Sequence, residues 1–243
     1  MLGKNLRIVV AGDSLGLPRI KPTLISYKDI WPYILEGKLK ERNVNSKILN
    51  HSERSRTLPK LLKNFQDIVS IWEPDILIIQ IGIVDCAPRL FSEREHKFLN
   101  SGIIHWRIAK AIINFASKHR RQIITLRPWV RYTPLKKFKK SLEDLGKILS
   151  QTNYKTIVLP IFPSFPSHTY RSPGYNESVE KYNNEWKNFC EKYSHIFINL
   201  EEIINDLKLE DLLLEDGHHL SKLGHLRIAT SLENKILEII NGK

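Results

Sequence analysis

Short apolar runs alternate with longer segments of helical periodicity along the chain, and this alternation constrains the fold more than any other feature. The apolar runs, rich in Ile, Val and Leu, lie at residues 6–11, 47–50, 75–81, 156–161 and 196–200. Such runs are typical of strands buried on both faces of a parallel sheet. The helical segments lie at residues 27–42, 102–118, 135–149, 178–193 and 221–240, with a short helical turn at 57–65. We therefore predict an α/β fold with helices on both faces of a five-stranded parallel sheet.

The length of the chain and of its apolar runs limits its organisation. A chain of 243 residues can bury a single core, so we expect one domain over residues 1–243. The longest apolar runs fall far short of the ~20 residues that a membrane-spanning helix needs. The first apolar run is too short for a signal peptide, and we therefore expect a cytoplasmic protein. Cys86 and Cys190 have no CxxC spacing, which predicts neither a disulfide framework nor a thiolate metal site.

The formal net charge of +12 favours anionic partners without choosing among them. No segment matches a nucleic-acid-binding module, so we do not expect nucleic acid as a partner. The densest basic stretch, residues 136–140, lies within a basic helical region around 101–151. We interpret its lysines as a solvated helix face, with a weak peripheral contact to a membrane as the alternative.

Two polar motifs occur where the ligands of open α/β sheets bind, near the carboxyl ends of the strands. The sequence GDSL at residues 12–15 follows the first run, and its glycine allows a tight turn that places Ser14 near a helix N-terminus. Asp216 precedes His219 by three residues, directly before the last helical segment. This spacing lets the carboxylate orient the imidazole as a general base for a serine. Each motif alone also fits a plain turn or helix cap, but the two together favour a nucleophilic serine.

In these blocks the sequence resembles the SGNH hydrolases, also called GDSL esterases. The resemblance rests on GDSL at residues 12–15, GIVD at 82–85 and DGHHLSKLGH at 216–225, with a weaker match at 179–184. It implies a flavodoxin-like three-layer α/β/α sandwich around a five-stranded parallel sheet. It also implies Ser14 as the nucleophile, His219 rather than His218 as the base, and Asp216 as the acid that orients the base. The basic region around 101–151 is untypical of the family and is expected to be an insertion.

Two positions depart from the family pattern. The glycine that donates to the oxyanion after the second strand corresponds to Ser55 here, with Ser52 as the alternative and Gly82 as a further oxyanion candidate. A serine retains the backbone N–H, so this departure costs little unless the position needs a positive φ. The asparagine of the family's GxND block is replaced by Val84, which cannot donate a side-chain hydrogen bond. Loss of one oxyanion donor typically costs about 100- to 1,000-fold in rate.

Charged and polar residues in the same loops are candidates for substrate binding. They are Asp13, Arg19, His51, Arg54, Arg56, Asp85 and Arg89. Arginine binds carboxylate and phosphate through paired hydrogen bonds, which predicts an anionic substrate. The alternative is that these arginines pair with local acids such as Glu53. The remaining histidines lack metal-ligand spacing, so we expect neither a metal nor a cofactor.

The blocks together predict a serine-dependent esterase in which Ser14 attacks an ester carbonyl and His219 transfers the proton. The resemblance implies a substrate that is an O-acylated, chiefly acetylated, carbohydrate, such as a bacterial surface polysaccharide, or a related small ester. Transfer of the acyl group to a sugar hydroxyl, as in an O-acyltransferase of polysaccharide biosynthesis, stays open. A second alternative is a repurposed scaffold with a dismantled oxyanion site, which binds or transfers an anionic sugar.

Overall fold

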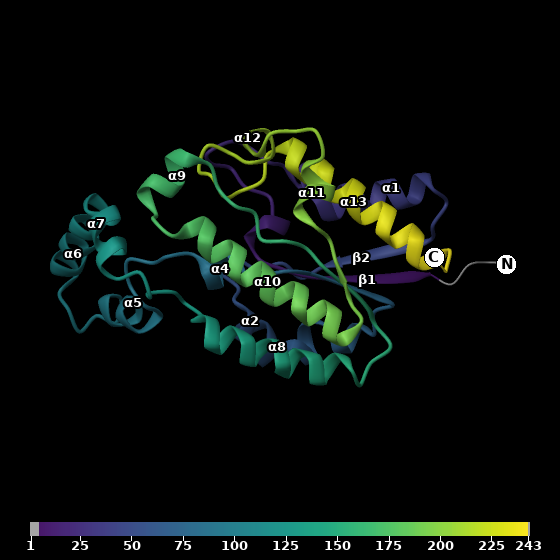
Figure 1. Ribbon diagram of the computed structural model, residues 1–243, viewed down its shortest axis with the longest axis horizontal. Coiled ribbons are helices and arrows are strands. Elements are labelled where there is room, and N and C mark those ends of the chain that lie inside the picture. Colours follow the sequence, from purple (N-terminus) through teal and green to yellow (C-terminus); the bar gives the residue numbers. More distant parts are fainter. Residues whose placement is uncertain (1–4, 243) are drawn as a thin grey trace.

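The five predicted strands form one parallel sheet in the order β2-β1-β3-β4-β5 (Figure 1). The computed structural model describes residues 5–242. The strands are β1 (Leu6–Gly12), β2 (Ser46–Asn50), β3 (Ile76–Gln80), β4 (Lys155–Val158) and β5 (Ile196–Phe197). Every residue of the central strand β3 is buried, as expected for a parallel sheet covered on both faces. The chain runs from β1 to β2 and then returns to β3 on the other side of β1, so the strand order reverses between β1 and β3.

Helices cover both faces of the sheet, which confirms the predicted three-layer α/β/α sandwich (Figure 1). One face is covered by α2 (Leu58–Lys63), α3 (Phe65–Ile68), α4 (Ile83–Cys86), α8 (Leu135–Leu149) and α10 (Tyr175–Tyr193). The other face is covered by α1 (Trp31–Glu41), α11 (Leu200–Ile204), α12 (Leu209–Leu212) and α13 (Lys222–Ile240). Each face has its own apolar core, with Trp186 fully buried in the first and Trp31 in the second. Removal of this apolar surface from water is the main force that stabilises the layers.

Some elements differ from the sequence-based prediction for local reasons. The segment predicted as one helix at 27–42 is divided into the 3-10 turn η2 (Tyr27–Asp29) and α1. The turn closes separately because the Asp29 carboxylate accepts hydrogen bonds from the backbone and the hydroxyl of Ser26. Strand β5 is only two residues long, because Asn199 follows it closely and begins α11 with a capping box.

The basic region around 101–151 has two parts. Helices α6 (Trp106–Lys118) and α7 (Arg120–Leu126), preceded by α5 (Glu93–Leu99), lie at one end of the molecule beyond the carboxyl ends of the strands (Figure 1, left). Helix α8 instead packs against α2 and α10, and its Phe138 is fully buried in the core. The region therefore contributes a group of helices at one end of the molecule and one helix, α8, of the layer that covers a face of the sheet. No helix within residues 5–242 is both long and apolar enough to cross a membrane.

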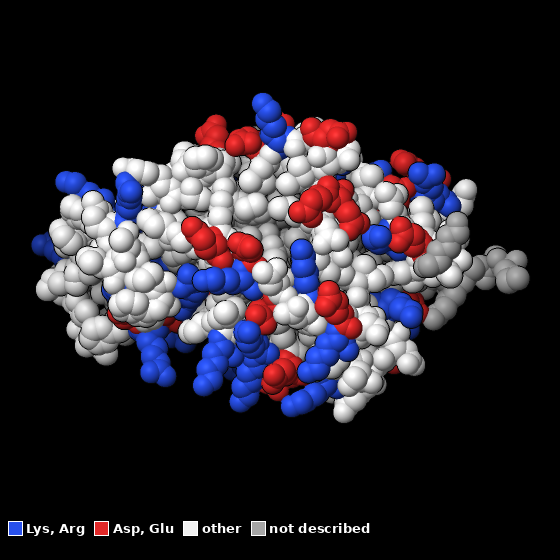
Figure 2. Space-filling view, in the orientation of Figure 1, with Lys and Arg blue, Asp and Glu red and all other residues white. Residues whose placement is uncertain are grey.

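The basic stretch on α8 faces solvent. Its lysines are exposed at positions 136, 137, 139 and 140. Lysine and arginine side chains gather along the lower edge of the face in Figure 2, where Figure 1 places α8. Lys139 pairs with Glu185 of α10 at 2.8 Å, so this lysine also links the two helices.

Candidate active site

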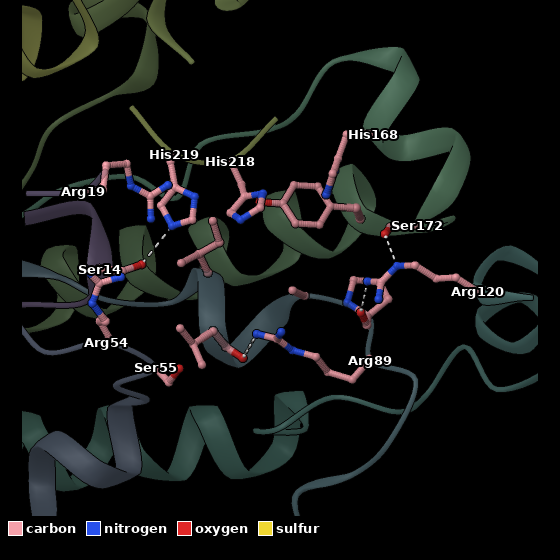
Figure 3. Close-up of a pocket in the computed structure, with 15 residues that line it drawn as sticks. Ser14, Arg19, Arg54, Ser55, Arg89, Arg120, His168, Ser172, His218 and His219 are labelled. Carbon is pink, nitrogen blue, oxygen red and sulfur yellow. Dashed lines mark hydrogen bonds between the residues drawn. The ribbon is translucent and has the colours of Figure 1, made fainter. Parts of the chain in front are cut away.

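A cavity of about 310 Å³ opens at the carboxyl ends of the strands, where the ligand sites of such sheets lie. Its walls come from the loops after β1, β2 and β3, from α7, α9 (Pro166–Arg171) and the start of α10, and from the turn before α13. Ser14 and His219 lie toward one end of the cavity and Arg89 and Arg120 toward the other (Figure 3). Segments far apart in the sequence therefore meet at one site.

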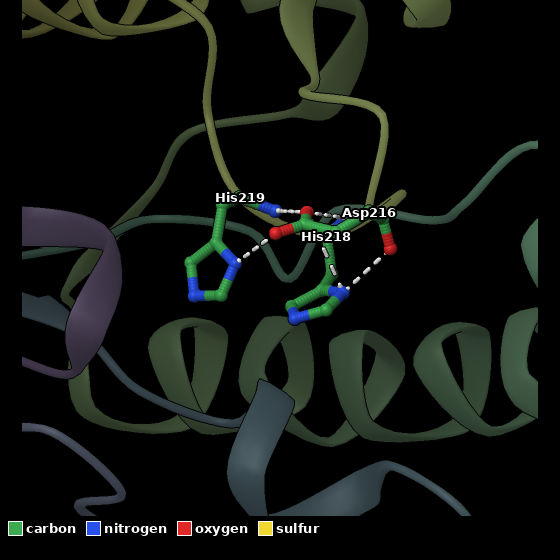
Figure 4. Close-up of side chains that lie close together, drawn as sticks. All are labelled: Asp216, His218 and His219. Carbon is green, nitrogen blue, oxygen red and sulfur yellow. Dashed lines mark hydrogen bonds and ion pairs between the residues drawn. The ribbon is translucent and has the colours of Figure 1, made fainter. Parts of the chain in front are cut away.

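Ser14, His219 and Asp216 form one connected chain of hydrogen-bonding groups. Ser14 is the first residue of the 3-10 turn η1 (Ser14–Gly16), which follows β1 almost directly. Its Oγ lies 3.3 Å from Nε2 of His219 (Figure 3). Nδ1 of His219 lies 2.7 Å from Oδ2 of Asp216 (Figure 4). The imidazole thus connects a hydroxyl to a carboxylate, which is the geometry that general-base activation of a serine needs.

The Asp216 carboxylate is held by its own turn and by Arg19. Its Oδ1 accepts hydrogen bonds from the backbone N–H groups of His218 at 3.2 Å and His219 at 3.0 Å. Nη1 of Arg19, whose side chain is 9% exposed, donates to Oδ2 at 3.3 Å. Burial raises the pKa of Asp216, but hydrogen bonds from His219 outweigh burial and hold the pKa below its usual range. The carboxylate is therefore ionised at neutral pH and holds His219 with Nε2 toward Ser14.

Asn50 and Ser52, after β2, hold the loop that carries the serine. Nδ2 of Asn50 donates to the backbone carbonyl of Gly16 at 2.8 Å. Oδ1 of Asn50 accepts from both the backbone N–H and the hydroxyl of Ser52, at 3.1 and 2.7 Å. A Cβ on Gly12 would approach Ser52 Oγ to 2.4 Å, so the two segments pack without room for a side chain. Ser52 is therefore not the oxyanion donor that the sequence offered as an alternative, because its N–H is already bound within the loop.

Of the other oxyanion candidates, Ser55 lines the cavity and Gly82 does not. No described residue accepts a hydrogen bond from the backbone N–H of Ser55, and its φ of +59° is the left-handed conformation that favours glycine. Gly82 has a φ of +143°, and a Cβ there would approach Ile161 to 2.3 Å, so this glycine serves the turn after β3. Val84, which is 7% exposed, lines the cavity where the family pattern has an amide.

Asp13 and Asp85 were predicted as substrate contacts, but the structure buries both outside the cavity lining. The Asp13 carboxylate caps η1 by accepting a hydrogen bond from the Leu15 backbone N–H at 2.9 Å. The Asp85 carboxylate accepts from the Leu58 backbone N–H at 3.1 and 3.2 Å. Burial raises the pKa of each carboxyl to about 7. Asp13 therefore caps its own turn, η1, and Asp85 binds the first N–H of α2.

Arg56 and His51 also lie outside the cavity lining, contrary to the prediction. The Arg56 guanidinium donates to the backbone carbonyls of Gly12 and His51 and pairs with Glu53 at 2.8 Å. For this arginine the alternative of pairing with a local acid is therefore correct. The His51 ring packs against Trp72 with ring centroids 5.2 Å apart, and burial lowers the pKa of this histidine. Both residues fix the loop after β2 to its surroundings.

The other three predicted arginines, Arg19, Arg54 and Arg89, line the cavity. Arg19 pairs with Asp216 and so contacts the hydrogen-bonded chain of Ser14, His219 and Asp216. Arg54 is exposed and donates to a backbone carbonyl at 3.3 Å. Arg89 donates to the backbone carbonyl of Val84 at 3.4 Å.

The sequence reasoning missed several residues of the cavity wall. They are Arg120, His168, Ser172, Tyr175 and His218. Most come from α7, from α9 and from the beginning of α10, and none shares a motif with the serine loop. The only sequence feature that points to Arg120 is the basic composition of the region around 101–151. This composition does not show which of its arginines reaches the cavity.

Asp216, His218 and His219 are the group of described residues whose ligand-type atoms could hold a metal ion, since these atoms lie within 4.8 Å of one another (Figure 4). Nδ1 of His218 lies 2.8 Å from the backbone carbonyl of Asp216. Burial lowers the pKa of His218 to about 4, so this ring is neutral at neutral pH. A cation at this position would compete with the hydrogen bond between Asp216 and His219, on which the orientation of His219 depends.

Comparison with known proteins identifies the family of the chain and shows solved structures of similar fold. The sequence matches the GDSL-like lipase/acylhydrolase family over residues 10–227, whereas a comparison with curated proteins gives no match. Among solved structures, the psychrotrophic esterase EstA from Pseudoalteromonas sp. is 17% identical, with a TM-score of 0.61 over 98% of this chain and 100% of that chain. A catalytic serine-to-alanine mutant of Axe2, an acetylxylan esterase from Geobacillus stearothermophilus, is 15% identical, with a TM-score of 0.65 over 97% and 95%. A lipase/acylhydrolase from Enterococcus faecalis is 15% identical, with a TM-score of 0.63 over 95% of each chain.

Proposed function

Because the chain belongs to the GDSL-like lipase/acylhydrolase family, we propose that it is a serine-dependent ester hydrolase with Ser14, His219 and Asp216 as its catalytic triad. The observation that carries this proposal is the connected chain from Ser14 Oγ through the His219 ring to the Asp216 carboxylate. A buried arginine and two backbone N–H groups hold that carboxylate ionised and in place. Each of the three groups therefore has the partner that its role requires.

The proposed reaction proceeds in two halves. Nε2 of His219 takes the hydroxyl proton of Ser14 while Oγ attacks the carbonyl carbon of the ester. The tetrahedral intermediate collapses, the bond to the alcohol oxygen breaks, and His219 returns the proton to the departing alcohol. Water then attacks the acyl-enzyme with His219 again as the base, which releases the carboxylic acid and restores Ser14. Asp216 stabilises the imidazolium in both halves without taking its proton.

We propose that backbone N–H groups stabilise the oxyanion of the intermediate. The N–H of Ser14 lies at the start of η1, and the N–H of Ser55 belongs to a residue on the cavity wall. Val84 supplies no side-chain donor beside them. A site with two donors instead of three keeps the stabilisation from those two and lacks the roughly 100- to 1,000-fold in rate that a third donor contributes.

For the substrate, we propose an O-acetylated carbohydrate. The support is the similarity of the fold to an acetylxylan esterase, together with a cavity bounded by polar side chains and by Ile83, Val84 and Ala87. A short acyl group fits beside these few apolar residues, and the sugar fits against the polar wall. Transfer of the acetyl group to a second sugar hydroxyl uses the same acyl-enzyme, with the hydroxyl in place of water.

The test is release of acetate from acetylated xylo-oligosaccharides and from 4-nitrophenyl acetate. The wild type is compared with Ser14→Ala and with Ser150→Ala, a change at an exposed serine outside the cavity lining. We expect Ser14→Ala to abolish turnover and Ser150→Ala to retain it. Full turnover by folded Ser14→Ala contradicts the proposal. Acetyl transfer to an added oligosaccharide, in place of acetate release, reassigns the enzyme as a transferase.

A further inference from the structure

Two arginines form the end of the cavity that lies away from Ser14. Arg120, on α7, donates through Nε to Ser172 Oγ at 3.1 Å and through Nη2 to the backbone carbonyl of Pro88 at 3.3 Å. Arg89 donates to the Val84 carbonyl, and its guanidinium lies over the ring of Tyr132, 4.5 Å from the ring centroid. Figure 3 shows both side chains, with Ser172 and His168, on the side opposite Ser14 and Arg54.

Neither arginine forms an ion pair among residues 5–242, whereas Arg7, Arg19, Arg42, Arg56 and Arg127 do. The other described arginines without an ion pair are exposed, apart from Arg131 and Arg227, and those two lie outside the cavity lining. Arg89 and Arg120 are therefore the half-buried arginines of the cavity wall that lack an ion pair. Nε of Arg89 is buried and meets no hydrogen-bond acceptor among the described residues. Partly buried cations normally have an anion or a full set of acceptors, because desolvation of an unpaired charge is unfavourable.

The surroundings of Arg120 add to this excess of positive charge. Burial lowers the pKa of its guanidinium, and the charges of Arg89 and Arg171 lower it further. Burial and the charge of Arg120 also lower the pKa of His168, which lines the same end. His168 therefore stays neutral, and its ring and the Ser172 hydroxyl add polar groups without adding negative charge.

We propose that Arg89 and Arg120 form a subsite for an anionic group of the substrate, and that this group is a phosphate monoester. Two guanidinium groups match the two charges of a phosphate monoester, and their planar N–H forks suit its oxygens. The proposal extends the proposed ester hydrolysis, because Ser14 and the two arginines share one cavity. The substrate is then an acyl ester that carries a phosphate on the same molecule, such as an acetylated sugar phosphate.

The catalytic experiment compares acetate esters of ω-hydroxyalkyl phosphates of increasing chain length with the matching neutral esters. The quantity measured is the ratio of kcat/KM for the phosphate ester to that for the neutral ester. We expect Arg120→Gln to lower this ratio at least about 10-fold, and Arg89→Gln to lower it likewise. The matched control is Arg121→Gln, which removes the same charge from the next position of α7, where Arg121 is exposed and stacks on Tyr170 outside the cavity lining. An equal fall in all three variants overturns the subsite, because it reports only net charge.

A binding experiment separates failure of the subsite from failure of the proposed function. Titration calorimetry with inorganic phosphate on wild type, Arg120→Gln and Arg121→Gln requires no turnover, and thermal unfolding shows that each variant is folded. Binding that is lost in Arg120→Gln and kept in Arg121→Gln supports the subsite even if no ester is hydrolysed. Absence of binding to folded wild type, or equal binding to both variants, overturns it. Tighter binding of acetate than of phosphate overturns the assignment to phosphate.

Discussion

Substitution of Val84 by asparagine probes the point at which this chain departs most from its family. Val84 is 7% exposed, lines the cavity, and lies on α4 directly after the turn at Gly82. Asparagine has nearly the same volume and brings an amide N–H₂ to the cavity. If the oxyanion has only backbone donors, the new amide adds the missing one.

Two opposing effects determine the size of the change. A full oxyanion donor contributes about 100- to 1,000-fold in rate, and an amide that is not held by neighbouring groups delivers part of this, so we expect kcat to rise at least about 10-fold. The amide replaces two buried methyl groups, which destabilises the protein by about 1–3 kcal/mol. For a chain of this length, that loss lowers Tm by roughly 2–10 °C.

The assay is hydrolysis of 4-nitrophenyl acetate. The rate of fluorophosphonate labelling is a second measure, because the phosphonate oxygen occupies the position of the oxyanion in the tetrahedral intermediate. Val84→Ala is the matched control, because it opens space without adding a donor. A rise in kcat with asparagine and not with alanine supports the two-donor site. An unchanged or lower kcat in folded Val84→Asn refutes the two-donor site, because it means that the oxyanion does not lack a donor at the position of residue 84.

Substitutions at Ser55, Gly82 and Asp85 test separate parts of the structure. Ser55→Gly should keep kcat within about 3-fold, because it retains the backbone N–H and relieves a left-handed conformation that is unfavourable for serine. Replacement of the Ser55 amide by a backbone ester removes the N–H without a change of φ and should lower kcat about 100-fold. Equal losses in both would contradict a backbone role. Gly82→Ala should destabilise the protein by at least about 2 kcal/mol, measured by urea unfolding. In an Ile161→Ala background the same substitution should cost less but still destabilise, because the contact with Cβ is relieved and the φ of +143° is not. For Asp85 the folded-state pKa of about 7 lies above the unfolded value, so wild-type stability falls as pH rises from about 4 through 7. Asp85→Asn should therefore gain Tm relative to wild type between about pH 5 and pH 8, and a constant difference over that range would contradict burial as the cause.

The fold could be predicted because its strands are buried on both faces. The run that became β3 is apolar at every position except its last residue, and no other environment explains that pattern as simply. The ends of elements could not be predicted as well, because they depend on local hydrogen bonds. The carboxylate of Asp29 and the cap at Asn199 ended or divided segments whose apolar pattern continued.

The contact between Asp216 and His219 could be predicted from their spacing, but the rest of the cavity wall could not be predicted in this way. Asp216 and His219 are three residues apart, so their contact is local and a motif can report it. Asp13 and Asp85 follow strands in the same way, yet their carboxylates bind the backbone N–H groups of Leu15 and Leu58. The sequence does not show which backbone N–H groups lack a partner, so these contacts could not be predicted. Arg120 reaches the cavity only through the packing of α7 near α9, and no local pattern reports that contact.

Labelling with a fluorophosphonate, followed by intact-mass measurement and peptide mapping, tests directly whether Ser14 is an activated nucleophile. This probe reports activation of a serine without knowledge of the natural substrate. The proposed triad predicts a single adduct on Ser14 in wild type, no adduct in Ser14→Ala, and strongly slowed labelling in Asp216→Asn, where the carboxylate that orients His219 is lost. Folded wild-type protein that forms no adduct, or an adduct on another residue that persists in Ser14→Ala, would contradict it.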